Sequence, residues 1–257
     1  MQNNNRHIFI AREGLAAKFI AHKLAQCTNL DGIIIELGKK AKKRKLKRLF
    51  KGKIWEFPPK ILDLLFIYRL NKVISKYIEN RMIEKEGVEE YPDKIPLFVF
   101  DDVNDRECIT KLNELAPDVL IVFGTSILKK PIIEIPKSDI LNIHGGIVPK
   151  YRNVHSEFWA MAKDDLDMIG TSIIHLDIGI DSGAVALQKT LKVEGNTSLA
   201  EIKYRNLKLS AELICEALAL HDKNELPYIP QKKDNMKFFK TPKYKDWRTF
   251  RHKIRLT

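Results

Sequence analysis

Asn142 and His144 stand two positions apart at the end of an apolar run, DILNIHGG (139–146). Because side chains alternate along a β-strand, both are expected to point to one side, and Leu141 and Ile143 to the other. A carboxamide and an imidazole aimed at one point can donate hydrogen bonds to the oxyanion of an acyl-transfer reaction. The bare backbone of the glycine pair that follows leaves room for a ligand to approach.

A second group of polar residues lies in the loop LDIGIDSGAV (176–185), where Asp177 and Asp181 stand among glycines between two apolar runs. This pattern predicts an exposed, shaped acidic loop. Residue types alone also allow structural roles, because a histidine at a strand end is often a hydrogen-bonded residue and an aspartate in such a loop often forms a turn. The loop lacks the further ligands of an EF-hand, and the histidines lack the HExxH spacing of a zinc site. The G-x-S-x-G motif of a serine nucleophile is also missing.

The elements that must position these residues alternate between strands and helices. Apolar runs predict strands and three-and-four spacing predicts helices; the strands are expected at 7–11, 31–37, 97–100, 118–124, 139–146, 170–177 and 183–193, and helices at 15–27, 104–115, 127–134 and from 199 onward. Strand–helix–strand alternation predicts an α/β fold with a Rossmann-like, mostly parallel sheet and flanking helices. The first turn lacks GxGxxG, which argues against a dinucleotide cofactor.

Two regions depart from this alternation. Residues 38–95 hold a basic stretch and then an amphipathic helix over 60–83, so we expect a helical insertion on the surface of the domain. On its apolar face we place six residues: Phe66, Leu70, Val73, Ile74, Tyr77 and Ile78. After His221 the chain is short, polar and basic. We therefore expect one catalytic domain over 1–221 and a short C-terminal extension over 222–257.

Composition sets the broad class of protein. The 257 residues are 44% hydrophobic and 30% charged, which is typical of a globular chain and excludes disorder. The three cysteines are far apart, and no apolar run is long enough to span a bilayer, so a cytoplasmic protein is expected. The net charge is +12, but residues 39–53 carry ten Lys or Arg and no acid. That run is either a solvated surface or a contact for something anionic, such as phosphates or lipid.

The order of several motifs resembles one known family. N-x-H at 142–144 is followed by Val148-Pro-Lys-Tyr-Arg152, Trp159-Ala160, Gly170-Thr-Ser172 and the Asp-x-Gly loop. This series is similar to the formyltransferases that use 10-formyltetrahydrofolate. The resemblance is specific across about 118–190, loose across 7–37, and does not cover 38–95 or the C-terminal extension.

The resemblance assigns roles to particular residues. Asn142, His144 and Asp181 match the family's catalytic triad, with Asp181 orienting the imidazole and taking up a proton. The segment that wraps the pterin of the donor matches Gly124, Thr125, Ser126, Ile127 and Leu128, and the loop that reads its amino-pyrimidine edge matches Asp177, Ile178, Gly179 and Ile180. The reaction needs no metal. Many members have Pro-Ser after the histidine, so Gly145-Gly146 is expected to widen or loosen the acceptor pocket.

The acceptor is chosen by comparing relatives within the family. Methionyl-tRNA formyltransferases also have a basic loop after the second strand, but they carry a C-terminal barrel for which 37 residues are too few. The resemblance to sugar N-formyltransferases instead implies a nucleotide-linked amino sugar in its dTDP, UDP or GDP form, destined for a polysaccharide such as O-antigen. The residues expected on the acceptor side are Arg12, Glu13, Gly14, Tyr151, Arg152 and Trp159. For Trp159, packing in the core is an equally good expectation.

Other functions stay open at this stage. A methionyl-tRNA formyltransferase-like enzyme is one, although we expect no nucleic-acid partner. A formyltetrahydrofolate deformylase, which passes the formyl group to water, is a second; its usual regulatory domain before the sheet is not expected here, because the first strand starts at His7. A non-enzymatic binding module is a third, disfavoured by the intact triad. A peripheral membrane contact through 39–53 and a homodimer are further expectations.

Overall fold

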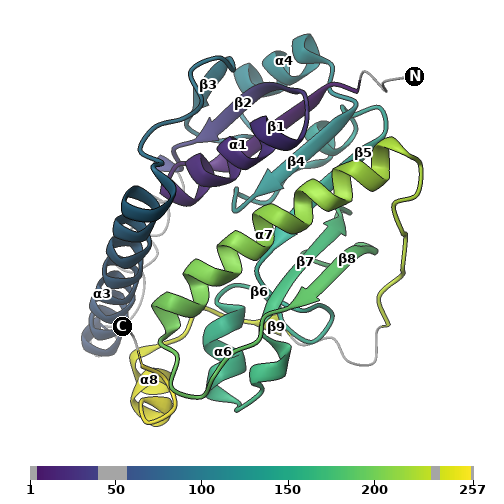
Figure 1. The fold of residues 1–257 in the computed structure, drawn as a ribbon. Coiled ribbons are helices and arrows are strands. Elements are labelled where there is room, and N and C mark those ends of the chain that lie inside the picture. Colours follow the sequence, from purple (N-terminus) through teal and green to yellow (C-terminus); the bar gives the residue numbers. More distant parts are fainter. Residues whose placement is uncertain (1–4, 40–56, 233–237, 256–257) are drawn as a thin grey trace.

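A computed structural model describes residues 5–39, 57–232 and 238–255. The main sheet has seven strands in the order β3-β2-β1-β4-β5-β7-β8, parallel as far as β5 and antiparallel from there to β8. The strands are β1 (His7–Arg12), β2 (Leu30–Glu36), β3 (Leu97–Phe100), β4 (Val119–Phe123), β5 (Asp139–His144), β7 (Gly170–His175) and β8 (Val185–Thr190). The predicted α/β fold with a mostly parallel sheet is confirmed (Figure 1).

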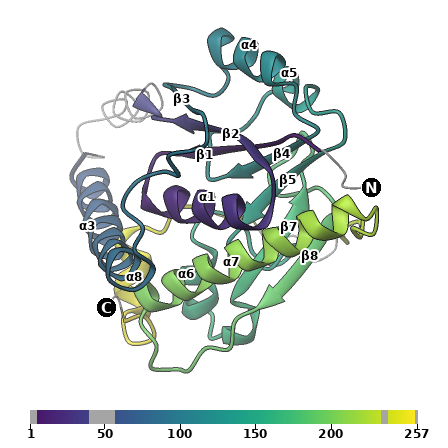
Figure 2. The same cartoon turned by 45° about the horizontal axis from the view of Figure 1, so that its top comes forward.

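Helices cover both faces of the sheet, as Figures 1 and 2 show. They are α1 (Leu15–Cys27), α3 (Phe57–Arg81), α4 (Arg106–Leu115), α5 (Lys130–Ile133), α6 (Ser156–Ala162), α7 (Leu199–Asp222) and α8 (Tyr244–Phe250), with a π-helical turn at Met82–Glu86 and a 3-10 turn at Leu166–Met168. Alternate residues of β1 show the layers: Phe9 joins the core under α1 and α7, and Ile10 joins the core under α4 and α5.

Helix α7 begins where the sequence predicts. The Ser198 hydroxyl accepts a hydrogen bond from the backbone N–H of Glu201 at 3.2 Å, as in the first half of a capping box. Its predicted apolar face is buried, including Leu199, Ile202 and Ile214. Helix α7 covers the side of β5 that carries Leu141 and Ile143. The residues that alternate with them, Asn142 and His144, therefore face away from α7.

Helix α3 confirms the predicted amphipathic helix, but it is more than a surface element. Leu70 and Ile74 are buried in a core shared with α6 and α7, and α8 packs against the same helix. Val73 is 37% exposed, so its predicted place on the apolar face is wrong. It lies one position before Ile74, which rotates it about 100° away from the buried side. Residues 40–53 of the basic run lie outside the described residues.

The chain after α7 holds structure that the sequence pattern did not indicate. Strand β9 (Phe238–Phe239) pairs in parallel with β6 (Arg152–Asn153) to form a separate two-stranded sheet. A disulfide joins Cys27 to Cys215 across 188 positions of the chain. Disulfides are rare in reducing compartments, so the bond gives no support to the cytoplasmic location predicted from the cysteine spacing. Among the helices that the structure describes, none has both the length and the hydropathy needed to cross a bilayer.

Candidate active site

Strand β5 presents Asn142 and His144 on one side and Leu141 and Ile143 on the other, as their spacing predicts. The two apolar side chains are buried beneath α7. The two polar side chains face a pocket at the carboxyl end of the parallel strands. This edge is where open α/β sheets bind ligands.

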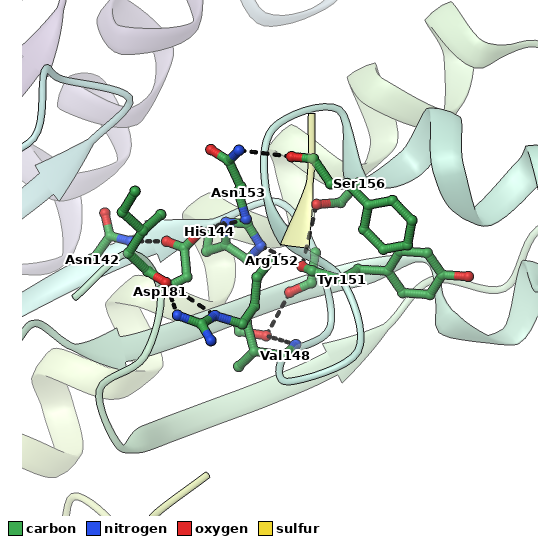
Figure 3. Close-up of polar contacts among 12 residues, drawn as sticks. Asn142, His144, Val148, Tyr151, Arg152, Asn153, Ser156 and Asp181 are labelled. Carbon is green, nitrogen blue, oxygen red and sulfur yellow. Dashed lines mark hydrogen bonds and ion pairs between the residues drawn. The ribbon is translucent and has the colours of Figure 1, made fainter. Parts of the chain in front are cut away.

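Asp181 reaches the same point from the loop between β7 and β8 (Figure 3). Its Oδ1 accepts a hydrogen bond from Nδ2 of Asn142 at 3.3 Å, and its Oδ2 lies 3.5 Å from Nδ1 of His144. The side chains of His144 and Asp181 are only 8% and 12% exposed, so their interaction is largely shielded from solvent. The backbone of Asp181 is left-handed, with φ of 48°, a conformation that aspartate and asparagine tolerate better than most residues.

The other ring nitrogen of His144 is held by the main chain. Nε2 donates to the carbonyl oxygen of Tyr151 at 2.7 Å. Both ring nitrogens therefore face acceptor oxygens, and both contacts can be hydrogen bonds only when the imidazole is protonated. In this arrangement the imidazole has no free N–H to donate to an oxyanion, contrary to the prediction. Asn142, which lines the pocket, has a second amide N–H besides the one bonded to Asp181.

The segment Tyr151–Asn153 holds the loop as well as the histidine. The backbone N–H of Asn153 donates to Oδ2 of Asp181 at 2.7 Å, and Nε of Arg152 donates to the carbonyl of Ile180 at 3.0 Å. Three consecutive residues thus make the contacts that orient both ionisable members of the triad. Asn153 was not among the predicted site residues. Its φ of 74° is the only local sign of a special role, and it becomes visible only in the structure.

A pocket of about 260 Å³ brings the predicted donor-binding residues together with the triad. Its wall includes the triad Asn142, His144 and Asp181, the segment Gly124, Thr125, Ser126, Ile127 and Leu128, and the loop residues Asp177, Gly179 and Ile180. Ile178 of the same loop does not line it and is 77% exposed. Asn153 and Val154 complete the side of the pocket nearest β6.

The glycine pair after His144 does not open space, contrary to expectation. A Cβ on Gly146 would lie 2.6 Å from Cβ of Ser156 and 2.7 Å from the carbonyl oxygen of Tyr151. Neither glycine lines the pocket. Gly146 is therefore required by the close approach of the 151–156 segment, and the expected widening of the acceptor side at this position is wrong.

Arg12, Glu13 and Gly14, which were expected to border a nucleotide, do not line the pocket. Nη2 of Arg12 contacts Oε2 of the buried Glu36 at 2.7 Å and donates to Oγ of Ser126 at 3.0 Å. Glu13 accepts a hydrogen bond from the hydroxyl of Tyr91 at 2.9 Å, and Gly14 caps α1. Arg12 therefore braces the 124–128 segment, and a phosphate would have to compete with Glu36 for it.

Tyr151 and Trp159 have packing roles. Tyr151 has no exposed surface, so its ring cannot contact an acceptor, and that expectation is wrong for its side chain. Burial first, and then the hydrogen bond to Asp165, raise the pKa of the Tyr151 phenol. Trp159 donates from Nε1 to the carbonyl of Lys240 and stacks on Phe239. Within residues 5–39, 57–232 and 238–255, no group of three His, Cys, Asp or Glu side chains could hold a metal ion.

The fold and site define an α/β protein whose polar triad lies at the carboxyl edge of its parallel strands. Its sequence matches the formyl transferase family over residues 67–218, more than half of the chain, so the protein belongs to that family.

Relatives by sequence include methionyl-tRNA formyltransferases from two bacteria. The one from Clostridioides difficile is 31% identical over 52% of this chain and 44% of its own length. The one from Methylacidiphilum infernorum is 32% identical over 62% of this chain and 51% of its own length. The chain thus spans about half the length, or less, of the curated relatives it matches.

Solved structures share the fold at low sequence identity. A sugar N-formyltransferase from Shewanella sp FDAARGOS_354 superposes with a TM-score of 0.57 at 12% identity, over 95% of this chain and 86% of that one. Glycinamide ribonucleotide transformylase 1 from Symbiobacterium toebii has a TM-score of 0.56 at 14% identity, over 86% and 89% of the chains. The N-formyltransferase from Helicobacter canadensis, solved with folinic acid and dTDP-3-aminofucose, has a TM-score of 0.56 at 15% identity, over 90% and 70%.

Proposed function

We propose that this protein transfers the formyl group of 10-formyltetrahydrofolate to the amine of a nucleotide-linked amino sugar. The observation that carries the proposal is the pocket in which Asn142, His144 and Asp181 face the same space as residues 124–128. Membership of the formyl transferase family supports the formyl chemistry. A fold shared with sugar N-formyltransferases supports the class of acceptor.

The pocket suits one end of the donor, the flat pterin ring. Its volume of about 260 Å³ is close to the lower end, about 300 Å³, of typical ligand pockets. Val122, Leu128 and Ile174 supply apolar walls, and the rim carries a few polar groups, as such pockets usually do. The N10 formyl group, next to the ring, would then lie toward the triad, which lines one side of the pocket.

In the proposed reaction the acceptor amine attacks the formyl carbon. A new C–N bond forms, the formyl oxygen becomes an oxyanion, and the bond to N10 of the folate then breaks. The amide of Asn142 has a second N–H, beyond the one bonded to Asp181, that can donate to the oxyanion. The His144–Asp181 pair can accept the proton lost by the amine, directly or through water, and return it to the folate nitrogen.

A methionyl-tRNA substrate is the second candidate. It is favoured by the relatives at about 30% identity and by the run of ten Lys or Arg at 39–53. We prefer the sugar because solved sugar N-formyltransferases share the fold, among them one solved with folinic acid and dTDP-3-aminofucose.

One assay separates these candidates. The purified protein is incubated with 10-formyltetrahydrofolate alone, with dTDP-, UDP- or GDP-linked amino sugars, or with methionyl-tRNA, and release of tetrahydrofolate is followed. We expect release with one of the sugars. Release only with methionyl-tRNA would show that the acceptor is the tRNA and not the sugar. Release without any acceptor would indicate a deformylase. Raising salt from about 50 to about 200 mM should weaken tRNA use by orders of magnitude and sugar use little.

We also propose a biological setting for this reaction. A formylated nucleotide sugar is an activated precursor, so we propose that the product is used to build a surface polysaccharide such as O-antigen. Sedimentation with vesicles that contain about 30% anionic lipid tests whether the basic run holds the protein near a membrane. Analytical ultracentrifugation tests the proposed homodimer.

A further inference from the structure

The chain returns to the active site after leaving α7. Residues Phe238–Phe239 form β9, which lies beside β6 (Figure 1). The two strands pair in parallel, with Arg152 opposite Phe238 and Asn153 opposite Phe239. The side chain of Asn153 adds a bond at the same place, because its Nδ2 donates to the carbonyl of Phe239 at 2.7 Å. A two-stranded sheet of four residues is not stable by itself in water, so side-chain packing must hold it together.

Phe239 supplies that packing. Its ring lies between two aromatic rings, with its centroid 5.2 Å from that of Tyr151 and 5.5 Å from that of Trp159, both stacked. The Nζ of Lys163 lies 5.6 Å from the same ring. Trp159 also bonds to the carbonyl of the next residue, Lys240, at 2.9 Å. Stacked aromatic pairs contribute beyond the area that they bury, so this residue couples β9 firmly to the segment around β6.

The segment that β9 holds is the one that orients the triad. Its contacts to His144 and Asp181 come from main-chain atoms, the carbonyl of Tyr151 and the N–H of Asn153. The position of a main-chain atom depends on the position of the whole segment to which it belongs. A shift of this segment would therefore move the acceptor of the histidine and the donor of the aspartate together.

A second contact from the same part of the chain supports the loop from its other side. Nε2 of Gln231 donates to the carbonyls of Asp181 and Gly183 at 2.9 and 2.8 Å, and Ile229 forms a bridge with Val185. The residues after α7 thus contact the segment 151–153 and also the loop that carries Asp181.

We propose that Phe239 is a positioning residue for the reaction, which acts on His144 and Asp181 through the segment 151–153. The inference rests on the proposed formyl transfer. The inference goes beyond that proposal because it assigns a positioning role to a residue outside the pocket. This residue lies in a part of the chain that the family match at 67–218 does not include.

The matched test compares Phe239→Ala with Phe238→Ala. Phe238 stands next to Phe239 on the same strand but is 51% exposed, so the two variants remove the same group from a packed and an open position. We expect Phe239→Ala to lower kcat about 10- to 100-fold, since displacements of about 1 Å can cost that much. The KM for the formyl donor should rise by a smaller factor than kcat falls, because Asn153 and Val154 form only one side of the pocket and the contacts of Phe239 described above do not reach 124–128. Phe239→Tyr should restore most of kcat, and Phe238→Ala should act like the wild type.

A second readout does not depend on activity. Hydrogen exchange at the backbone N–H of Asn153, which donates to Asp181, should speed up in Phe239→Ala and not in Phe238→Ala. An unchanged kcat and exchange rate in Phe239→Ala would overturn the inference, and so would a parallel rise in donor KM with loss of folded protein by circular dichroism. An inactive wild type with altered exchange at Asn153 only in Phe239→Ala would refute the proposed function and leave the positioning contact standing.

Discussion

The main-chain carbonyl of Tyr151 accepts a hydrogen bond from Nε2 of His144 at 2.7 Å, while the side chain of Tyr151 is completely buried. The histidine is therefore oriented by a backbone atom whose place is set by packing of the same residue's ring. This relationship links the position of the N-x-H strand end to that of the Tyr-Arg motif, although seven positions separate His144 from Tyr151. It also explains why Tyr151 can matter for the reaction without touching a substrate.

Replacing Asp181 with Asn tests the charge at the centre of the site. Asparagine tolerates the left-handed backbone at this position, so the fold should be kept. Its amide nitrogen would face either Asn142 or the N–H of Asn153, both donors, so we expect a loss of about 1–3 kcal/mol in the free energy of unfolding. We expect the rate of formyl transfer to fall about 10²- to 10⁴-fold, because the proton acceptor beside His144 is lost. Steady-state kinetics with thermal melting measures both. Full activity in this variant would remove Asp181 from the mechanism.

Replacing Asn142 with Ala tests the proposed oxyanion donor. Loss of one such donor costs about 10²- to 10³-fold in kcat in comparable sites. We expect a fall of that size in kcat with little change in KM, since the interaction belongs to the transition state. The control is Asn113→Ala, which removes an amide from the exposed surface of α4 and should leave the kinetics unchanged. A rise in KM alone would show that Asn142 only binds substrate.

Replacing Gly146 with Ala tests the close approach of the 151–156 segment. The new methyl group would meet Ser156 and the carbonyl of Tyr151 below 3 Å, so we expect a loss of about 1–3 kcal/mol in the free energy of unfolding. Urea titration measures it. Gly195→Ala is the control, because nothing lies within 4 Å of its Cβ. Adding Ser156→Gly should recover part of the loss; a Gly146→Ala variant as stable as the wild type would contradict the packing described here.

The pair His175–Asp139 predicts a dependence of stability on pH. Burial lowers the pKa of His175, but hydrogen bonds from its ring to Asp139 and to the carbonyl of Pro227 outweigh this, so the net pKa is raised. The protonated ring can donate to both oxygens, and the neutral ring to only one. Its contribution to stability is therefore complete below about pH 6.5, the unfolded value, and is lost as pH rises through the raised pKa.

Asp139→Asn should remove this dependence. The difference in free energy of unfolding between wild type and variant is expected to be larger at about pH 5.5 than at about pH 9. Asparagine can still accept the bond from the N–H of Ile140, so the start of β5 is kept. Urea titrations of both proteins at the two pH values give the comparison. A difference that is equal at both pH values, or that grows at high pH, would contradict the assignment.

Local patterns in the sequence were enough for the elements and for one side of the site. The alternation of apolar residues in 139–144 records burial on one face of a strand, and this places Asn142 and His144 together whatever else the fold does. The same holds for the buried face of α7 and its cap at Ser198. Such features depend on neighbours within a few positions, which is why periodicity and capping residues predict them.

Only the tertiary structure decided which distant segments meet. Asp181 contacts Asn142 across 39 positions, Asn153 of β6 bonds to Phe239 of β9 across 86, and Cys27 bonds to Cys215 across 188. An apolar residue such as Phe239 carries in its type a tendency to be buried but no record of its partner. The tight fit at Gly146 and the burial of Tyr151 likewise follow from how segments pack, because hydrophobic burial has no direction of its own and the shape of the whole core selects the contacts.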